Sequence, residues 1–199
     1  MKLTTLFLTT LTATALAACS GKSGGIQRTE ADAARKAKAD PADSTLYVKL
    51  TSVRGDSLVA TDQHSDAEVV LSVIEANQSG RVFGNLISDD TYALTTVAGK
   101  HTVQTAINLS QLEGMWLLAD KSGNGIRLEA DGAASIVGSL ADITLRSWRI
   151  FNGRLMLSFI KNDGSNYEET EEAVRLVKLS TDALSMSFHN HHFDFYREK

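Results

Sequence analysis

The chain has 199 residues, enough for one medium domain or two small ones, and 43% hydrophobic content with a single proline indicates a folded protein. The formal net charge of −4 and the pI near 5.7 argue against a basic surface that would bind nucleic acid. One cysteine is present, which excludes an internal disulfide and any cysteine-based metal cluster.

The first 18 residues have the pattern of a secretory signal peptide. Lys2 supplies a positive charge, and residues 3–16 are apolar or threonine with no charged side chain. This run is too short for a membrane-spanning helix, which needs about 20 residues. It ends at Leu16-Ala17-Ala18-Cys19, where small residues precede the cysteine. We expect residues 1–18 to be a lipoprotein signal peptide, and the alternative is an ordinary secretory signal with a chance cysteine after it.

The segment from Leu16 to Cys19 resembles the lipobox of bacterial lipoproteins. The resemblance implies cleavage before Cys19, attachment of diacylglycerol to its thiol, and acylation of the new amine with chains such as palmitate. Several acyl chains, at about 0.8 kcal/mol per buried methylene, hold a protein firmly on a bilayer. Ser20 follows the cysteine in place of an aspartate, and no acidic cluster comes next. By analogy with lipoprotein sorting, this favours the bacterial outer membrane and a periplasm-facing position.

Residues 19–44 are small, charged and nearly free of large apolar side chains. Such a segment cannot bury enough surface to offset the entropy lost on ordering. We expect a lipidated tether, flexible at Gly24-Gly25, that lets the globular part stand off the lipid surface. Residues 21–25 match the Gly-x-Ser-x-Gly string of hydrolases, but that motif needs a strand before it and a helix after it. In a tether we interpret the match as chance.

From Thr45 onward the sequence favours β-strands. Short runs of alternating or β-branched apolar residues are separated by Gly, Asp and Asn. Residues 45–107 are therefore predicted to form a small domain of five or six strands that resembles an OB-like β-barrel. The runs expected as strands are TLYVKLTSV, SLVATD, AEVVLSVIEA, RVFGNLIS, TYALTTV and HTVQTAINL.

Residues 112–198 continue the β pattern in about eight longer runs. Helical stretches are not predicted between them, so neighbouring strands should pair antiparallel, and eight strands can close into a barrel without exposed edges. The apolar positions change parity between Leu145 and Trp148, which predicts a β-bulge near Arg146-Ser147. The predicted runs are GMWLLAD, GIRLEAD, AASIVGS, DITLRSWRIFN, GRLMLSFIKN, EEAVRLVKLS, ALSMSF and HFDFYRE, with turns expected at Asn124-Gly125, Asp131-Gly132, Asn152-Gly153 and Asp163-Gly164.

A Gly-x-Trp motif on the first of these strands, with an arginine on the last, resembles the lipocalin and calycin pattern. The resemblance implies that Trp116 closes one end of the barrel, that Arg197 packs across its ring, and that Gly114 belongs to the same motif. A guanidinium over an indole contributes about 0.5 to 2 kcal/mol. The runs QLEGMW, GIRLEADGAAS and TLRSWRIFNGRLMLS also resemble the lipocalin-like domain of Bacteroidetes lipoproteins. Full lipocalins are longer and have a helix after the strands, so the expected fold for residues 111–199 is a short eight-stranded lipocalin-like barrel.

Two polar runs suggest metal sites, but each has a simpler explanation. FHNHHF places His189 and His191 on one face of a strand, as metal ligands require, yet a solvated hairpin turn from His189 to His192 explains the run. The acidic run EETEE (168–172) lacks the spaced oxygen ligands of a calcium loop, and a solvated hairpin end explains it. A nucleophile–base pair cannot be assembled from the sequence. We therefore assign no catalytic residue, metal or cofactor, and expect a protein that is not an enzyme.

Two functions remain open for the predicted barrel. It either binds a small hydrophobic or amphipathic ligand, or its interior is filled by its own side chains. In the second case the chain is a protein–protein interaction or envelope-stress sensing module with an envelope protein as partner. The side chains expected to line a ligand site alternate inward along the strands: Leu118, Ile126, Leu128, Leu145, Leu157, Phe159, Met186 and Phe188.

Overall fold

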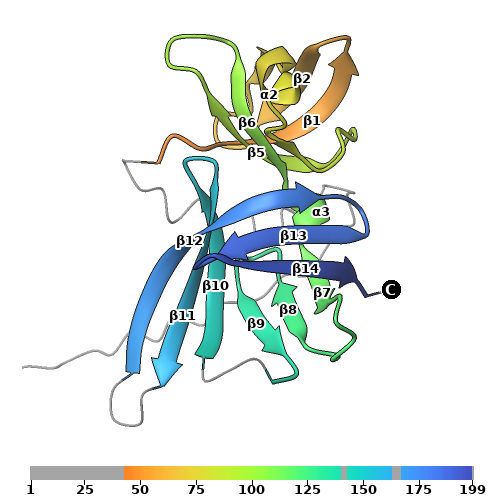
Figure 1. The fold of residues 1–199 in the computed structure, drawn as a ribbon. Coiled ribbons are helices and arrows are strands. Elements are labelled where there is room, and N and C mark those ends of the chain that lie inside the picture. Colours follow the sequence, from red (N-terminus) through yellow and green to blue (C-terminus); the bar gives the residue numbers. More distant parts are fainter. Residues whose placement is uncertain (1–42, 140–142, 163–166, 199) are drawn as a thin grey trace, which may run out of the picture.

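The computed structural model describes residues 43–139, 143–162 and 167–198. The predicted signal peptide, Cys19, most of the tether and the turn expected at Asp163-Gly164 lie outside these residues. A small mixed sheet sits above an eight-stranded antiparallel barrel, so the chain is all-β as predicted (Figure 1). Among the helices of the described ranges, none has both the length and the apolar character needed to cross a membrane.

The small sheet has the strand order β3-β2-β1-β5-β6-β4, and its neighbours pair antiparallel except β4 and β6. A parallel bridge from Ser72 to Thr102 brings the end of β3 beside the start of β6 and curls the sheet. The first unit is therefore a curled, mixed six-stranded sheet, and its identity as an OB-like barrel stays a prediction. The elements are β1 Leu46–Arg54, β2 Ser57–Asp62, β3 Glu68–Ser72, α2 Ile74–Gln78, β4 Val82–Phe83, β5 Thr91–Thr96 and β6 Val103–Asn108.

Two of the runs expected as strands in this sheet are only partly extended. The run AEVVLSVIEA ends as a strand at Ser72 and continues as α2, whose Ala76 is fully buried. Alanine and glutamate favour helix over strand, and the β-branched residues before them masked that preference. In RVFGNLIS only β4 is a strand, because Gly84 has φ +88° and lies so close to Asn108 that a Cβ there would be 2.6 Å from the Asn108 Cβ.

The barrel has the strand order β10-β11-β12-β13-β14-β7-β8-β9, with every neighbouring pair antiparallel. The first and last strands lie side by side, with Arg197 opposite Trp116, as a closed barrel requires. The loose seam lies instead between β9 and β10, where an isolated bridge joins Ala133, just before β9, to Ser147 of β10. The strands are β7 Gly114–Leu118, β8 Gly125–Leu128, β9 Ala134–Val137, β10 Ile143–Phe151, β11 Arg154–Asn162, β12 Tyr167–Leu179, β13 Ala183–Phe188 and β14 His191–Arg197.

The predicted bulge in β10 is confirmed. The register with β11 shifts between Leu145 and Ser147, so the extra residue is Arg146. An extra residue reverses which side chains face inward. Leu145 and Trp148 therefore both point into the barrel, which explains the change of parity in the sequence.

The turn predictions hold at one Asn-Gly pair and fail at another. Asn152 and Gly153 have φ angles of +49° and +73°, as a tight two-residue turn requires, and connect β10 to β11. The pair Asn124-Gly125 is not a turn, because Gly125 is the first residue of β8. A Cβ at Gly125 would collide with the carbonyl oxygen of Trp116, so this glycine permits close approach of two strands.

The small sheet has a hydrophobic core of its own, and a few of its residues also join the core of the barrel. Helix α3, Leu109–Leu112, follows β6 directly, and the side chain of Asn108 caps it by accepting from the Gln111 amide at 2.9 Å. Ala93, Ile107 and Leu109 belong to the same buried cluster as the barrel side chains. The two units are therefore packed together rather than joined by a loose linker.

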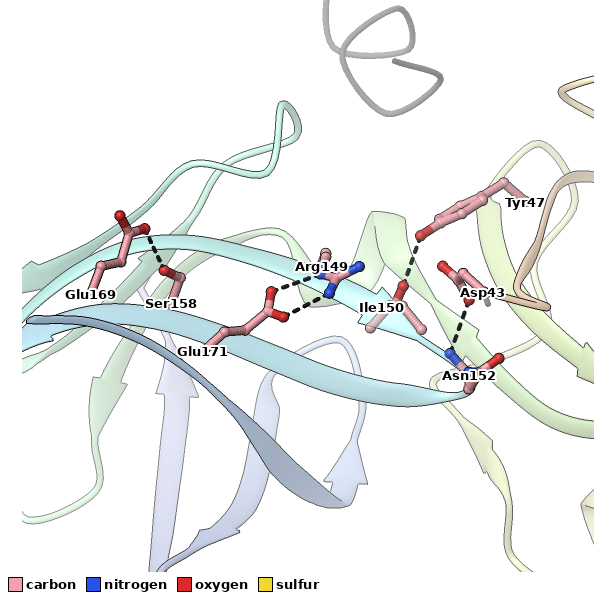
Figure 2. Close-up of polar contacts among 8 residues, drawn as sticks. All are labelled: Asp43, Tyr47, Arg149, Ile150, Asn152, Ser158, Glu169 and Glu171. Atoms are coloured by element: carbon pink, nitrogen blue, oxygen red, sulfur yellow. Dashed lines mark hydrogen bonds and ion pairs between the residues drawn. The ribbon is translucent and has the colours of Figure 1, made fainter. Parts of the chain in front are cut away.

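Hydrogen bonds tie the β10–β11 hairpin to the start of the small sheet (Figure 2). The hydroxyl of Tyr47 donates to the carbonyl of Ile150 at 3.0 Å. The main-chain amide of Asn152 donates to Asp43 Oδ1 at 3.1 Å and to Thr45 Oγ1 at 2.9 Å. These contacts hold the hairpin against the small sheet. The amide of its turn residue Asn152 is hydrogen-bonded by side chains of the segment that precedes β1.

Candidate functional site

Trp116 lies where the barrel meets α3. Its side chain is fully buried, and its indole nitrogen donates to the carbonyl of Leu112 at 2.7 Å. Leu112 is the last residue of α3, so this bond also satisfies a carbonyl that the short helix leaves free. The tryptophan thus joins the barrel wall to the helix that enters it.

Arg197 packs on Trp116 and binds the chain around it. Its Cζ lies 4.3 Å from the centre of a Trp116 ring. Nη1 donates to the Glu113 carbonyl and Nε to the Thr181 carbonyl, each at 2.7 Å. Nη2 donates to the Gln111 carbonyl. Partial burial lowers the pKa of Arg197 from its ordinary value, and the carbonyl oxygens around it compensate for the water that burial removes.

Gly114 leaves the space that Arg197 occupies. Its φ of +124° is a conformation that side chains rarely adopt, and a Cβ would collide with Nη1 of Arg197. The spacing Gly-x-Trp therefore has two physical reasons. The glycine admits the guanidinium, and the tryptophan two residues later provides the surface on which the guanidinium packs.

The eight side chains expected to line a ligand site all belong to one hydrophobic cluster. Five are buried and three are partly buried and packed against the others. Four positions of the cluster are fully buried: Trp116, Leu128, Leu155 and Leu184. The barrel interior at these positions is therefore occupied by the protein's own side chains. The buried five are Ile126, Leu128, Leu145, Phe159 and Met186, and the partly buried three are Leu118, Leu157 and Phe188.

An aromatic group with one histidine–carboxylate contact lies where the β13–β14 turn meets β12. Phe188 contacts Phe159 edge to face, with ring centres 5.8 Å apart, and stacks on His189 at 4.1 Å. His189 Nε2 is 2.5 Å from a carboxylate oxygen of Glu172. His189 and Asn190 form the turn, with φ angles of +46° and +65°. The expected turn from His189 to His192 is therefore too long, because His191 and His192 already belong to β14.

The acidic run EETEE was expected to be a hairpin end but forms part of β12. Glu171 binds Arg149 on β10 through two hydrogen bonds of 2.7 Å, and Glu169 accepts from Ser158 at 2.8 Å (Figure 2). The Arg149–Glu171 pair reaches across β11, which lies between β10 and β12, and so ties three strands together. These carboxylates therefore support a long strand that the sequence pattern did not predict.

The histidines near the C-terminus do not assemble into a metal centre. His192 Nε2 lies 3.1 Å from Asp194 Oδ1, and a hydrogen bond from Ser185 lowers the pKa of the Asp194 carboxyl. Groups of three potential ligands are absent from residues 43–139, 143–162 and 167–198. The two-residue contact of His192 and Asp194 lies on the exposed face of β14.

A hollow of about 310 Å³ opens at the seam between β9 and β10. Ile136 of β9 and Leu145 of β10 line it, and both also contact the barrel core. Figure 1 shows the lower ends of the two strands diverging. Only Leu145 was among the residues expected to line a ligand site. The sequence predicts strands but not which neighbours fail to pair, so it gave no signal for the rest of this hollow.

Residues 108–198 match a family model described as lipocalin-like. A solved structure of a lipocalin-like protein from Bacteroides thetaiotaomicron is 22% identical and aligns over 43% of this chain and 95% of its own, with a TM-score of 0.37. Comparison with curated proteins gives no match.

Proposed function

We propose that the lipocalin-like domain formed by residues 108–198 binds a small hydrophobic or amphipathic molecule, without catalysis, at the seam between β9 and β10. The observation that supports this function is the hollow of about 310 Å³ whose walls include Ile136 and Leu145. Small-molecule sites have volumes from about 300 Å³ upward, and this hollow combines apolar side chains with the hydroxyl groups of Ser135, Ser139 and Thr144. An isolated bridge joins the residue before β9 to β10, and no ladder pairs the described residues of the two strands at the hollow, so they can separate at the hollow without breaking one.

Filling this hollow is expected to abolish ligand binding. Ile136→Trp should weaken binding of the neutral apolar probe N-phenyl-1-naphthylamine by at least about tenfold, since the indole would occupy the probe's space. Fluorescence titration of the chain from residue 19 onward, with Cys19→Ser, measures this. Val137→Trp is the matched control, because Val137 is the next residue on β9 and does not line the hollow. Equal binding by the Ile136→Trp variant, or no binding by the parent chain, would contradict the proposal.

The alternative is an interaction or envelope-stress sensing module with a solid barrel. The complete burial of Trp116, Leu128 and Leu155 favours it, since these side chains occupy the interior of the barrel. Native mass spectrometry of chains purified from their own envelope separates the two functions. Repeated detection of bare protein mass, together with a stoichiometric crosslinked envelope protein, would favour the solid module.

We also propose that Cys19 anchors the protein to the periplasmic face of a bacterial outer membrane. The support is the run Leu16-Ala17-Ala18-Cys19 followed by Ser20. Cys19→Ser should remove all acyl label and move the protein from the detergent phase to the aqueous phase, because the thiol is the point of lipid attachment. Ser20→Ala should remain lipidated and sediment with outer membranes. A Cys19→Ser chain that still partitions into detergent would rule out this anchor.

A further inference from the structure

A second hollow lies between the small sheet and the barrel, away from the β9–β10 seam. Its volume is about 610 Å³. One side of the hollow is formed by the segment from α2 to β4 together with β6. The other side is formed by the start of β11 and the middle of β12. This volume is within the range of small-molecule sites, which often occur between domains. We call it the interdomain groove.

The lining of the interdomain groove is positively charged. Arg81, Arg154 and Arg175 line it, and acidic residues are absent from its described lining. None of the three arginines forms an ion pair with a described residue. By contrast, Arg127 and Arg149 each pair with a glutamate. A chain with a net charge of −4 thus places three guanidinium groups around one hollow, without a carboxylate partner among the described residues.

Two of these arginines come opposite each other on neighbouring strands. The pairing of β11 with β12 starts at Leu155 opposite Val174, so the next position brings Arg154 level with Arg175. Both side chains are exposed on the outer face of the barrel. Like charges in this arrangement destabilise a sheet. A bound anion between them would remove the repulsion, whereas the described residues provide no carboxylate to do so.

The walls of the groove are held in place without a ligand. Gly153 has φ +73° and packs so closely on the small sheet that a Cβ there would be 3.3 Å from Thr95 and Thr105 side-chain atoms. The amide of Asn152 is bound by Asp43, as Figure 2 shows. A preformed site loses less entropy on binding than one that must be ordered. Arg154 follows this anchored turn directly, so its backbone position is fixed.

We propose that the interdomain groove binds a small amphipathic anion with a phosphate or carboxylate headgroup. Guanidinium groups form paired, charge-assisted hydrogen bonds with both kinds of headgroup. Phe83 and Val177 also line the groove, and Val177 is 47% exposed, so apolar surface is available for the rest of the molecule. Ser79 and Thr105 add hydroxyl groups.

Calorimetric titration of the whole processed chain with Cys19→Ser tests this site, with dodecyl phosphate below its micelle concentration as probe. The double variant Arg154→Gln/Arg175→Gln should weaken binding at least about tenfold, because two charged hydrogen-bond donors are lost. Arg54→Gln is the matched control, since Arg54 is exposed and does not line the groove. The double variant should also have a Tm about 1 to 3 °C higher, because the like-charge contact is gone.

Further probes identify the headgroup and separate this site from the seam. Tighter binding of dodecyl phosphate than of dodecanoate assigns a phosphate headgroup, and the reverse assigns a carboxylate. Equal binding of dodecanol would overturn the proposal, as would equal binding of inorganic phosphate or unchanged affinity in the double variant. Ile136→Trp should leave dodecyl phosphate binding intact, while the arginine double variant should still bind N-phenyl-1-naphthylamine. The proposal for each site can therefore be contradicted without contradicting the other.

Discussion

Trp116→Ala is expected to lower the free energy of unfolding by about 3 to 5 kcal/mol, as for other fully buried aromatic side chains. The variant loses the contacts that fill the barrel end, the hydrogen bond to the Leu112 carbonyl and the surface on which Arg197 packs. The partly buried guanidinium would then face a cavity. Denaturant titration followed by circular dichroism measures the change.

Tyr196→Ala provides the control for this experiment. Tyr196 precedes Arg197 on β14, pairs with Leu117 across the same strands, and is 41% exposed. Its removal should change the free energy of unfolding by only about 0.5 kcal/mol, as for most surface substitutions. If Trp116→Ala had an equally small effect, Trp116 would not be the residue that closes the barrel.

Gly114→Ala is expected to lower the free energy of unfolding by about 2 to 4 kcal/mol. Two costs combine, namely a backbone conformation at φ +124° that alanine rarely adopts, and a collision of the new methyl group with Arg197. Thermal and denaturant unfolding measure the sum. This single methyl group should therefore be about as harmful as the loss of a buried leucine side chain.

Two further variants separate these costs. Gly99→Ala has φ +70° with no atom near the new methyl group, so it reports backbone strain alone and should cost about 1 to 2 kcal/mol. Adding Gly114→Ala to an Arg197→Ala chain removes the collision, so the alanine should then cost less than in the parent chain. An identical cost in both backgrounds would mean that Gly114 is required only for its backbone conformation.

The strands of the barrel could be predicted because alternation is local. Each strand exposes every second side chain to the core, so a run such as GRLMLSFIKN identifies β11 without knowledge of its neighbours. The bulge at Arg146 was visible for the same reason, as a change of parity within one run. The helix at Ile74–Gln78 was missed because Val69, Val70 and Leu71 just before it made the whole run look extended.

The long-range features of the site could not be predicted. No local pattern shows that β9 and β10 separate below the bridge from Ala133 to Ser147, or that Arg81 approaches the barrel from the other unit. The close approach of Gly125 to the Trp116 carbonyl could not be predicted either, because the sequence Asn-Gly is also typical of a turn. Such features depend on which strands meet, and that information is spread over the whole chain.

The cluster that joins Ala93 and Ile107 to the barrel side chains has a consequence for how this protein can be changed. A domain cut out at residue 108 could not simply be transferred to another protein. Removing the small sheet would expose apolar atoms of the barrel that the sheet now covers. A transferred domain would therefore need another segment to cover this surface, with Tyr47 or an equivalent side chain included.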